Sequence, residues 1–488
     1  MFEDGQEEVP LSAAQLREQL VQQLVTGGAI RSSQIAQAFS DIPRELFLPP
    51  DISLEKVYTD DAIVVKWNDA KAATSSSTQP FLMADMLEAL DLQPGQNVLE
   101  IGAGVGYNAA IMIHVLGDGN LLTSIDLDPA MAETTRQNLI KLGAVYERAT
   151  IVTGDGSQGY LPNAPYDRII VTVQQWEISP DWVNQLKEGG ILILPLSISA
   201  HVWGGLIPAF RKEADGTLRA VGASHGGFMP MRGRMAHPQA QQDEVDAPPR
   251  SRPVRLGLLA SEVLNELPPN SSPDLYVTDS GLPKSVLELL ENQAELCYNP
   301  SEILQFNVGE LPPSTVKWNT MSLEQRRASR AYFGYTSLLA IAVEDCISTL
   351  LIGLYPPTET TAEFEEAPPT DNTLRFEARG LVLALMLPDK TSFDLVLLIS
   401  GLAQGWWVTT SRKKRHDTQT QNLALAKLLE VWEIWHQLSQ PMPSDYRPLA
   451  YPADQLPPGP GFVIHRKYYN LLIPTNWKDM EQDWSKSN

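Results

Sequence analysis

Three carboxylates in the first half of the chain each end a short apolar run, namely Glu100, Asp126 and Asp155. Directly after Glu100, the glycines of a G-x-G-x-G pattern, Gly102, Gly104 and Gly106, let the backbone turn sharply and approach a ligand closely. A carboxylate at the position of Asp126 can accept both hydroxyls of an adenosine ribose. Asp155, beside Gly156, is placed to meet an adenine amino group. NAD-binding folds share such a turn, so the glycines alone predict only a nucleotide-like ligand.

The surrounding elements predict that these side chains meet at one edge of a sheet. Apolar strands are expected at residues 98–101, 121–125, 150–153, 168–173 and 191–194, and helices between them at 108–116, 131–142 and 182–186. Strands that alternate with helices at this spacing predict an α/β fold with a doubly wound parallel sheet, closed by a hairpin at 203–210 and 218–221. All three acids then lie at carboxyl ends of strands, where open α/β sheets bind ligands.

A second group of reactive side chains precedes the glycine turn. Residues 71–80 are small and polar and include Ser76 and Thr78, between an expected strand at 62–65 and an expected helix at 81–90. By composition alone this stretch is an ordinary flexible polar loop. Hydroxyl groups can also donate hydrogen bonds to a carboxylate, and the sequences that flank the stretch decide between these two interpretations.

Five stretches of the first half form a combined pattern, which are Ile42–Phe47, Thr78-Gln79-Pro80, Val98–Tyr107, Gly154–Tyr160 and Pro165–Thr172. In these stretches, residues 13–235 resemble the protein-L-isoaspartate O-methyltransferase family. Many methyltransferases share the glycine motif, whereas the Gln-Pro and GDGxxGY-like motifs together are far more specific. The resemblance implies a Rossmann-like class I methyltransferase that uses S-adenosylmethionine, with Thr78 and Ser76 at the catalytic positions. It also implies that Glu100, Gly102, Gly104, Gly106, Asp126, Asp155 and Gly156 bind the cofactor.

Two features depart from the family pattern. Thr78 stands where the family has a serine, which adds a methyl group and restricts χ1. The preceding strand, Ala62-Ile63-Val64-Val65-Lys66, replaces the usual small-Leu-Pro-Ile-Gly pattern. These departures place the chain in a divergent branch. Three functions therefore stay open: repair-type methylation of isoaspartyl or aspartyl carboxylates in proteins or peptides, methylation of a dedicated peptide selected by the C-terminal region, and non-catalytic binding.

Charge and composition exclude several other classes of protein. The chain has 488 residues and a net charge of −22, which argues against a nucleic-acid partner or an anionic membrane surface. Its two cysteines cannot form a metal cluster on their own, no metal is expected, and a reducing cytoplasm fits. The acidic N-terminus lacks the features of a signal peptide. The apolar run at 337–355 is interrupted by Glu344 and Asp345, which predicts a buried helix and no membrane span.

The chain is long enough for more than one domain. We expect a catalytic domain at 1–235, a linker rich in Gln, Asp, Pro and Arg at 236–253, and a C-terminal α+β domain at 254–488. In that domain, helices are expected at 256–267, 285–296, 323–354 and 418–438, and strands at 373–387, 393–399, 406–410 and 462–464.

Overall fold

A computed structural model of the chain divides it into two units. The first comprises residues 1–196, 204–237 and 446–488, and the second comprises 197–203 and 238–445. The structure describes residues 10–69, 73–198, 205–236, 335, 337–339, 341–342 and 423–475, together with the backbone of eight strands between residues 254 and 412.

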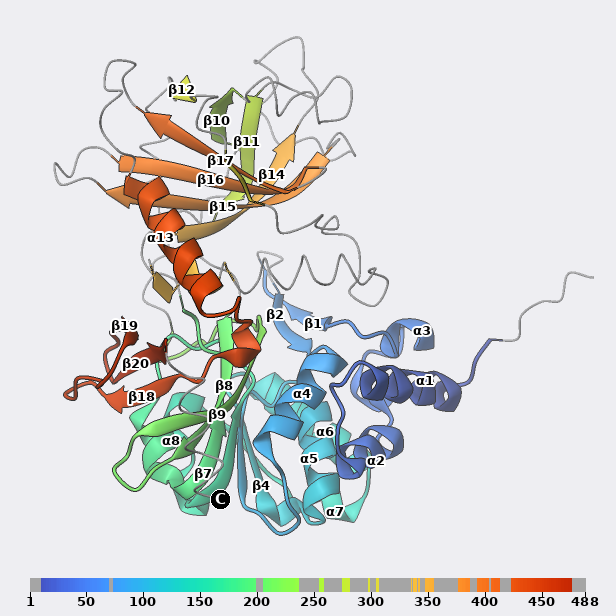
Figure 1. Cartoon of the computed structure of the whole chain (residues 1–488). Helices are drawn as coiled ribbons and strands as arrows, with labels where there is room; N and C mark the ends of the chain where they lie inside the picture. The colour runs from blue at the N-terminus through green and yellow to red at the C-terminus, as the bar shows by residue number, and fades with distance from the viewer. Residues whose placement is uncertain are drawn as a thin grey trace, which may run out of the picture. The chain divides into compact units, whose positions relative to one another are not determined.

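The first unit is built on one mixed sheet (Figure 1). Its strand order is β19-β20-β18-β9-β8-β7-β6-β3-β4-β5. The five strands from β7 to β5 are parallel: β3 (Val98–Ile101), β4 (Leu122–Asp126), β5 (Thr150–Thr153), β6 (Tyr166–Val171) and β7 (Leu186–Ile193). From β3 the chain first moves outward to β4 and β5 and then returns to β6 on the other side. This reversal beside β3 is the position at which doubly wound sheets bind ligands, and it confirms the predicted fold class.

The central elements are the most apolar ones. All four residues of β3 are buried, as are nine of the ten residues of α5 (Tyr107–Leu116), which explains why their sequence shows no polar face. Helix α4 (Pro80–Leu90) packs in the same core, together with α1 (Ala13–Thr26) and α2 (Ser33–Asp41). Helix α6 (Pro129–Lys141) contacts β4 and β5, and α8 (Pro180–Gln185) contacts β7. The glycine turn between β3 and α5 is thus fixed at both of its ends.

The polar stretch at 71–80 is not simply a loop. Residues Ala73–Ser77 form strand β2, which pairs antiparallel with β1 (Ile63–Trp67). The sequence did not indicate this strand because small polar residues show no alternation of apolar and polar side chains. Hydrogen bonds to β1, rather than burial of apolar side chains, hold these residues in an extended conformation.

The C-terminal strands differ from the predicted domain boundary. Strand β18 (Leu449–Pro452) pairs with β9 (Leu218–Gly226), and β20 (Tyr469–Pro474) and β19 (Gly461–Ile464) extend the same sheet. Between β9 and β7 lies β8 (Gly205–Lys212). The structure therefore assigns the chain from Tyr446 onward to the first unit, not to the predicted second domain. Local sequence patterns cannot show that a late strand pairs with an early one.

The second unit contains an antiparallel sheet of order β10-β11-β14-β15-β16-β17-β12, with β13 paired to β17. Its strands are β10 (Val254–Leu258), β11 (Asp274–Ser280), β12 (Cys297–Tyr298), β13 (Leu304–Phe306), β14 (Ile347–Leu354), β15 (Phe376–Met386), β16 (Phe393–Leu402) and β17 (Gly405–Arg412). The last three strands and helix α13 (Leu423–Gln437) agree with the elements expected there.

Two of the helix predictions for the second unit are wrong in part. Residues Ile347–Leu354, expected at the end of a long helix, form β14, and Val254–Leu258 form β10 where a helix was expected to begin at 256. Short apolar runs fit a buried strand as well as a buried helix, and pairing with β15 decides for the strand. The helix expected at 285–296 lies outside the described residues. None of the described helices is long and apolar enough to cross a membrane.

Candidate active site

The glycine turn joins the end of β3 to the start of α5. Gly102, Gly104 and Gly106 have φ values of 98°, 56° and 86°, which are left-handed conformations that favour glycine. A Cβ on Gly102 would lie 2.5 Å from Thr172 Oγ1, so this position is also closed to side chains by packing. The N-cap Gly106 provides no side-chain cap, and the first-turn N–H groups of α5 remain uncapped by a side chain. Such groups favour a polar or anionic ligand.

Asp126 lies at the end of β4 and is tied to this turn. Its Oδ2 accepts a hydrogen bond of 2.9 Å from Gly104 N, and its Oδ1 accepts one of 2.9 Å from Asp128 N. Each carboxylate oxygen has a second lone pair with which to accept a ligand hydroxyl. Burial raises the pKa of Asp126, and the two backbone hydrogen bonds oppose that shift. The structure thus brings two of the predicted cofactor residues, Gly104 and Asp126, into direct contact.

Glu100, which the resemblance assigns to the cofactor, lies in the interior of the first unit. Its side chain is completely buried beneath the turn. Asn108 Nδ2 donates to Oε1 at 2.7 Å, and Ser124 Oγ donates to Oε2 at 2.5 Å. Burial raises the pKa of Glu100 to about 7, although both hydrogen bonds lower it. The buried carboxylate of Glu100 therefore connects β3, β4 and α5 beneath the turn.

Asp155 and Gly156 follow β5 at the same edge of the sheet. A Cβ on Gly156 would lie 2.6 Å from Ile101 Cγ2, so only glycine lets this turn pack against the end of β3. Asp155 Oδ1 accepts from Ser157 N at 3.0 Å, and Oδ2 accepts from Arg234 N at 2.9 Å. Burial raises the pKa of Asp155, but hydrogen bonds from Arg234 and Ser157 together with the charge of Arg234 outweigh burial, so the pKa is lowered. Asp155 therefore lies at the predicted ligand-binding edge of the sheet, and its carboxylate also accepts a hydrogen bond from the segment that contains Arg234.

The hydroxyl-bearing strand β2 lies against the glycine turn. A Cβ on Gly104 would be 3.9 Å from Ser76 O and 4.0 Å from Ser75 Oγ, which is ordinary van der Waals contact. Ser76 and Thr78 flank the buried Ser77, which is the last residue of β2. Within the described residues, no hydrogen bond occupies the hydroxyl of Ser76 or Thr78. Neither hydroxyl is therefore engaged by another described residue, and both lie in the segment that contacts the turn through Ser75 and the Ser76 backbone.

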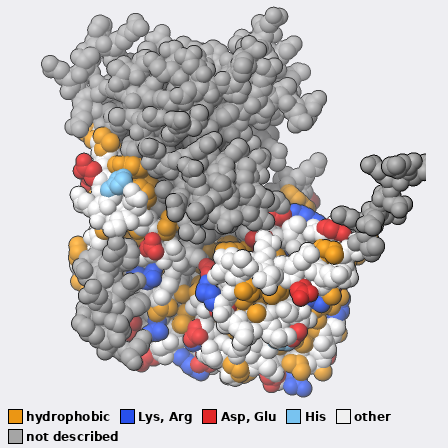
Figure 2. All heavy atoms as spheres, turned by 45° about the vertical axis from the view of Figure 1, so that its right-hand side comes forward, with side chains coloured by type: hydrophobic (Ala, Val, Ile, Leu, Met, Phe, Trp, Pro, Cys, Tyr) orange, Lys and Arg blue, Asp and Glu red, His pale blue; other side chains and the backbone are white. Residues whose placement is uncertain are grey.

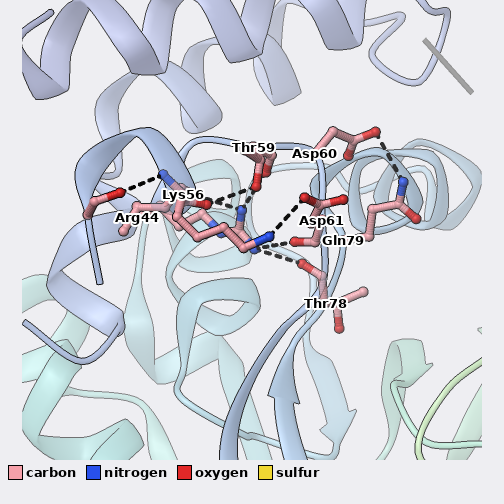
Figure 3. A network of polar contacts seen from close by, with 9 residues as sticks. Arg44, Lys56, Thr59, Asp60, Asp61, Thr78 and Gln79 are labelled. Carbon is pink, nitrogen blue, oxygen red and sulfur yellow. Dashed lines mark hydrogen bonds and ion pairs between the residues drawn. The ribbon is translucent and has the colours of Figure 1, made fainter. Parts of the chain in front are cut away.

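Two residues that sequence reasoning assigned no role hold this strand in place (Figure 3). The guanidinium group of the completely buried Arg44 donates to the carbonyl of Thr78 at 3.2 Å. The carboxylate of Asp60 accepts from Gln79 Nε2 at 3.1 Å and from Phe81 N at 2.8 Å. Arg44 belongs to one of the stretches that carried the family resemblance, but its partners are distant in sequence. Only the folded structure shows what it contacts.

An ion pair connects the β1–β2 hairpin to the segment between β4 and α6. Lys66 Nζ donates to Asp128 Oδ2, and Asp128 is the N-cap of α6. The strand that departs from the family pattern thus contributes the cation that ties the hairpin to the end of β4. Among the residues that the structure describes, no group of three or more His, Cys, Asp or Glu side chains is arranged to hold a metal ion.

Carboxylates at the ends of β4 and β5, a glycine turn at the reversal point of the sheet and an adjacent hydroxyl strand define a class I methyltransferase that uses S-adenosylmethionine. Comparison with known proteins identifies the family within this class of enzymes. Residues 14–236 match the family model of protein-L-isoaspartate(D-aspartate) O-methyltransferase. The chain belongs to the protein-L-isoaspartate O-methyltransferase family.

Three relatives with this name document the membership. The protein from Ignicoccus hospitalis is 36% identical over 180 residues, which are 37% of this chain and 81% of the relative. The protein from Methanopyrus kandleri is 35% identical over 222 residues, 44% of this chain and 91% of the relative. The protein from Pyrococcus horikoshii is 37% identical over 216 residues, 44% of this chain and 91% of the relative. The similarity therefore covers nearly the whole length of the relatives and less than half of this chain.

Proposed function

We propose that this chain transfers a methyl group from S-adenosylmethionine to the carboxylate of an L-isoaspartyl or aspartyl residue in a protein or peptide. The observation that carries the proposal is the contact between the strand that bears Ser76 and the glycine turn at Gly104. This contact puts the segment that carries the Ser76 and Thr78 hydroxyls beside the candidate cofactor cradle. Membership of the family supports an enzyme over a non-catalytic binding protein.

The residues of the chain have a limited chemical task in such a reaction. A peptide carboxylate is ionised at neutral pH, since its ordinary pKa is about 4, and needs no general base to act as a nucleophile. When bound, S-adenosylmethionine supplies the electrophilic methyl group on its sulfonium. The chain must orient the carboxylate oxygen and exclude water. Ser76 and Thr78 would donate hydrogen bonds to the acceptor carboxylate, and Gly104 with Asp126 would hold the adenosyl side.

The cofactor assignment fits the residues at the turn. Asp126 is already fixed by Gly104 N and Asp128 N and retains lone pairs for ribose hydroxyls. We assign Gly102, Gly104, Gly106, Asp126, Asp155 and Gly156 to cofactor binding, and Glu100 to support of the turn. Damaged proteins of many sequences are the proposed substrates. A dedicated peptide selected by the region that begins near residue 254 is the alternative.

The cellular setting and the domain limits are also part of the proposal. The acidic composition and the two cysteines support a cytoplasmic protein that binds neither nucleic acid nor membranes. On the face of the described residues shown in Figure 2, acidic and basic side chains are interspersed. We infer that the second domain begins after a linker at 236–253 and ends before Tyr446, where the chain returns to the catalytic sheet.

Substitution of Thr78 tests the proposed site. Thr78→Ala removes one hydrogen bond to a charged acceptor and should lower kcat/KM for an isoaspartyl peptide roughly 10- to 100-fold, since such bonds contribute about 1.5–3 kcal/mol. Thr78→Ser keeps the hydroxyl and should stay close to the wild-type rate. Titration calorimetry should give the same affinity for S-adenosylmethionine in all three proteins. Equal turnover by the alanine variant and the wild type would refute the assignment.

A further inference from the structure

The side chain of Arg44 is completely buried, yet it is a cation with five N–H donors. Its partners are backbone carbonyls and one hydroxyl. Nη1 donates to Val57 O at 2.8 Å and Thr59 O at 3.1 Å, and Nη2 donates to Asp61 O at 3.2 Å, Thr78 O at 3.2 Å and Ser77 Oγ at 3.5 Å. Burial lowers the pKa of Arg44, and the nearby Tyr107 and Asp60 oppose this shift. Burying such a group is costly unless its hydrogen bonds are satisfied.

The hydrogen bonds of Arg44 connect two segments of the chain. Three of the acceptors lie in the segment 57–61, and the other two belong to Ser77 and Thr78. Arg44 thus joins the chain before the β1–β2 hairpin to the chain that leaves it (Figure 3). Ser77 Oγ accepts from Arg44, and the hydroxyl-bearing Ser76 and Thr78 are its direct neighbours in the chain.

Asp60 fixes the same segment from its other end. Its two carboxylate oxygens accept from Phe81 N and Gln79 Nε2 at the start of α4. The start of α4 has no side-chain cap of its own at Gln79, so Asp60 supplies the acceptor for the backbone N–H of Phe81 in the first turn. Ser77 to Phe81 is therefore held by a cation at one end and by a carboxylate at the other, with Thr78 between them.

We propose that Arg44 is a positioning residue for methyl transfer, which sets the orientation of the Ser76 and Thr78 hydroxyls through its bonds to Thr78 O and Ser77 Oγ. This inference rests on the proposed function. Arg44 itself does not contact the acceptor carboxylate, since its guanidinium lies on the buried face of the strand. Its contribution is pre-organisation: without it the Thr78 peptide can rotate, and the acceptor is no longer held in line for transfer.

The guanidinium fork is essential to this role. Arg44→Lys keeps a positive charge but places a single ammonium group where two nitrogens now serve acceptors on both segments. The chain offers a matched control in Arg168, a second buried arginine whose Nε and Nη2 donate to the carbonyls of Leu90 and Asp91. Arg168 lies near the amino end of β6, away from the glycine turn. Arg168→Lys therefore imposes a similar loss of arginine–carbonyl bonds without touching the hydroxyl strand.

The test compares the full-length wild type, Arg44→Lys and Arg168→Lys with an isoaspartyl peptide. We expect Arg44→Lys to lower kcat at least tenfold while the dissociation constant for S-adenosylmethionine changes less than threefold. Arg168→Lys should keep kcat within twofold of wild type. In Arg44→Ala, guanidinium chloride at low millimolar concentration should restore part of kcat, and sodium chloride at the same ionic strength should not. Equal kcat in Arg44→Lys and Arg168→Lys would overturn the proposal.

Amide hydrogen exchange provides a second readout that does not require turnover. Residues 73–79 should exchange faster in Arg44→Lys than in wild type, and at the wild-type rate in Arg168→Lys. The same rise in both variants would show a general loss of stability and overturn the positioning role. If Arg44→Lys does not fold, Asp60→Asn should give the same loss of kcat and the same local exchange. A wild type that methylates no carboxyl peptide would refute the proposed function, whereas unchanged exchange of residues 73–79 in Arg44→Lys would refute the positioning by Arg44 alone.

Discussion

Replacement of Glu100 by glutamine tests how the structure supports the glycine turn. Glu100 is completely buried, and burial raises its pKa from 4.5 to about 7. Glutamine has nearly the same shape and cannot ionise. It keeps one oxygen to accept from Asn108 Nδ2 and presents an N–H to Ser124 Oγ, which can act as an acceptor. The substitution thus removes the ionisable carboxyl group while the hydrogen bonds to Asn108 and Ser124 remain.

The sign of the effect follows from proton linkage. The folded state binds the Glu100 proton more tightly than the unfolded state, so the protonated carboxyl contributes stability that is fully present below pH 4.5. That stability is lost as the pH rises to about 7 and beyond. With 1.36 kcal/mol per pKa unit, the wild type should lose roughly 2–3 kcal/mol of unfolding free energy between pH 5 and pH 8 through this group. Glu100→Gln should not show this loss.

The assay must report on the first unit alone, because the chain has two units and whole-chain unfolding need not be two-state. Amide exchange of β3 and α5 at pH 5, 6.5 and 8 gives local unfolding free energies once intrinsic exchange rates are removed. We expect the advantage of Glu100→Gln over wild type to grow by roughly 2–3 kcal/mol from pH 5 to pH 8. A difference that stays constant with pH would refute a buried, proton-binding Glu100.

Two further predictions concern the hairpin and the C-terminal strands. Lys66→Ala breaks the partly buried pair with Asp128 and should weaken S-adenosylmethionine binding about two- to fivefold at low salt, since such pairs contribute up to about 1 kcal/mol. The control Lys187→Ala, which breaks a pair with Asp167, should bind normally in the same calorimetric titration, and equal affinities of both variants would contradict a role for the hairpin. A chain that ends at residue 240 lacks β18 and exposes the edge of β9, so it should aggregate in size-exclusion chromatography. A monodisperse, active fragment of that length would contradict the assignment of β18 to the catalytic sheet.

The placement of the proposed cofactor residues at one edge of the sheet could be predicted from the sequence because the signals are local. Gly102, Gly104 and Gly106 follow an apolar strand, Asp126 ends β4 and Asp155 comes directly after β5. The alternation of strands and helices also determines that these strand ends share one edge. The environment of Glu100 could not be predicted in this way. Its position in the motif does not reveal that its carboxylate is buried and bonded to α5 and β4.

The acceptor side could be predicted only in part. Ser76 and Thr78 were recognised by resemblance, but the strand that contains Ser76 and its support by Arg44 depend on pairing between distant segments. The same holds for β18, which completes the catalytic sheet after a long intervening region. Tertiary hydrogen bonds of this kind leave no periodic pattern in the sequence, so propensity and spacing cannot indicate them.

Methyl transfer to a defined carboxyl group is the most direct test of the central claim. Full-length protein is incubated with methyl-labelled S-adenosylmethionine and three peptides that differ only in one residue, which is isoaspartate, aspartate or asparagine. We predict a base-labile label, released as methanol, on the isoaspartyl or aspartyl peptide and none on the asparagine peptide. Absence of label from both carboxyl peptides, or label that resists base, would contradict the assignment of this chain as a carboxyl methyltransferase.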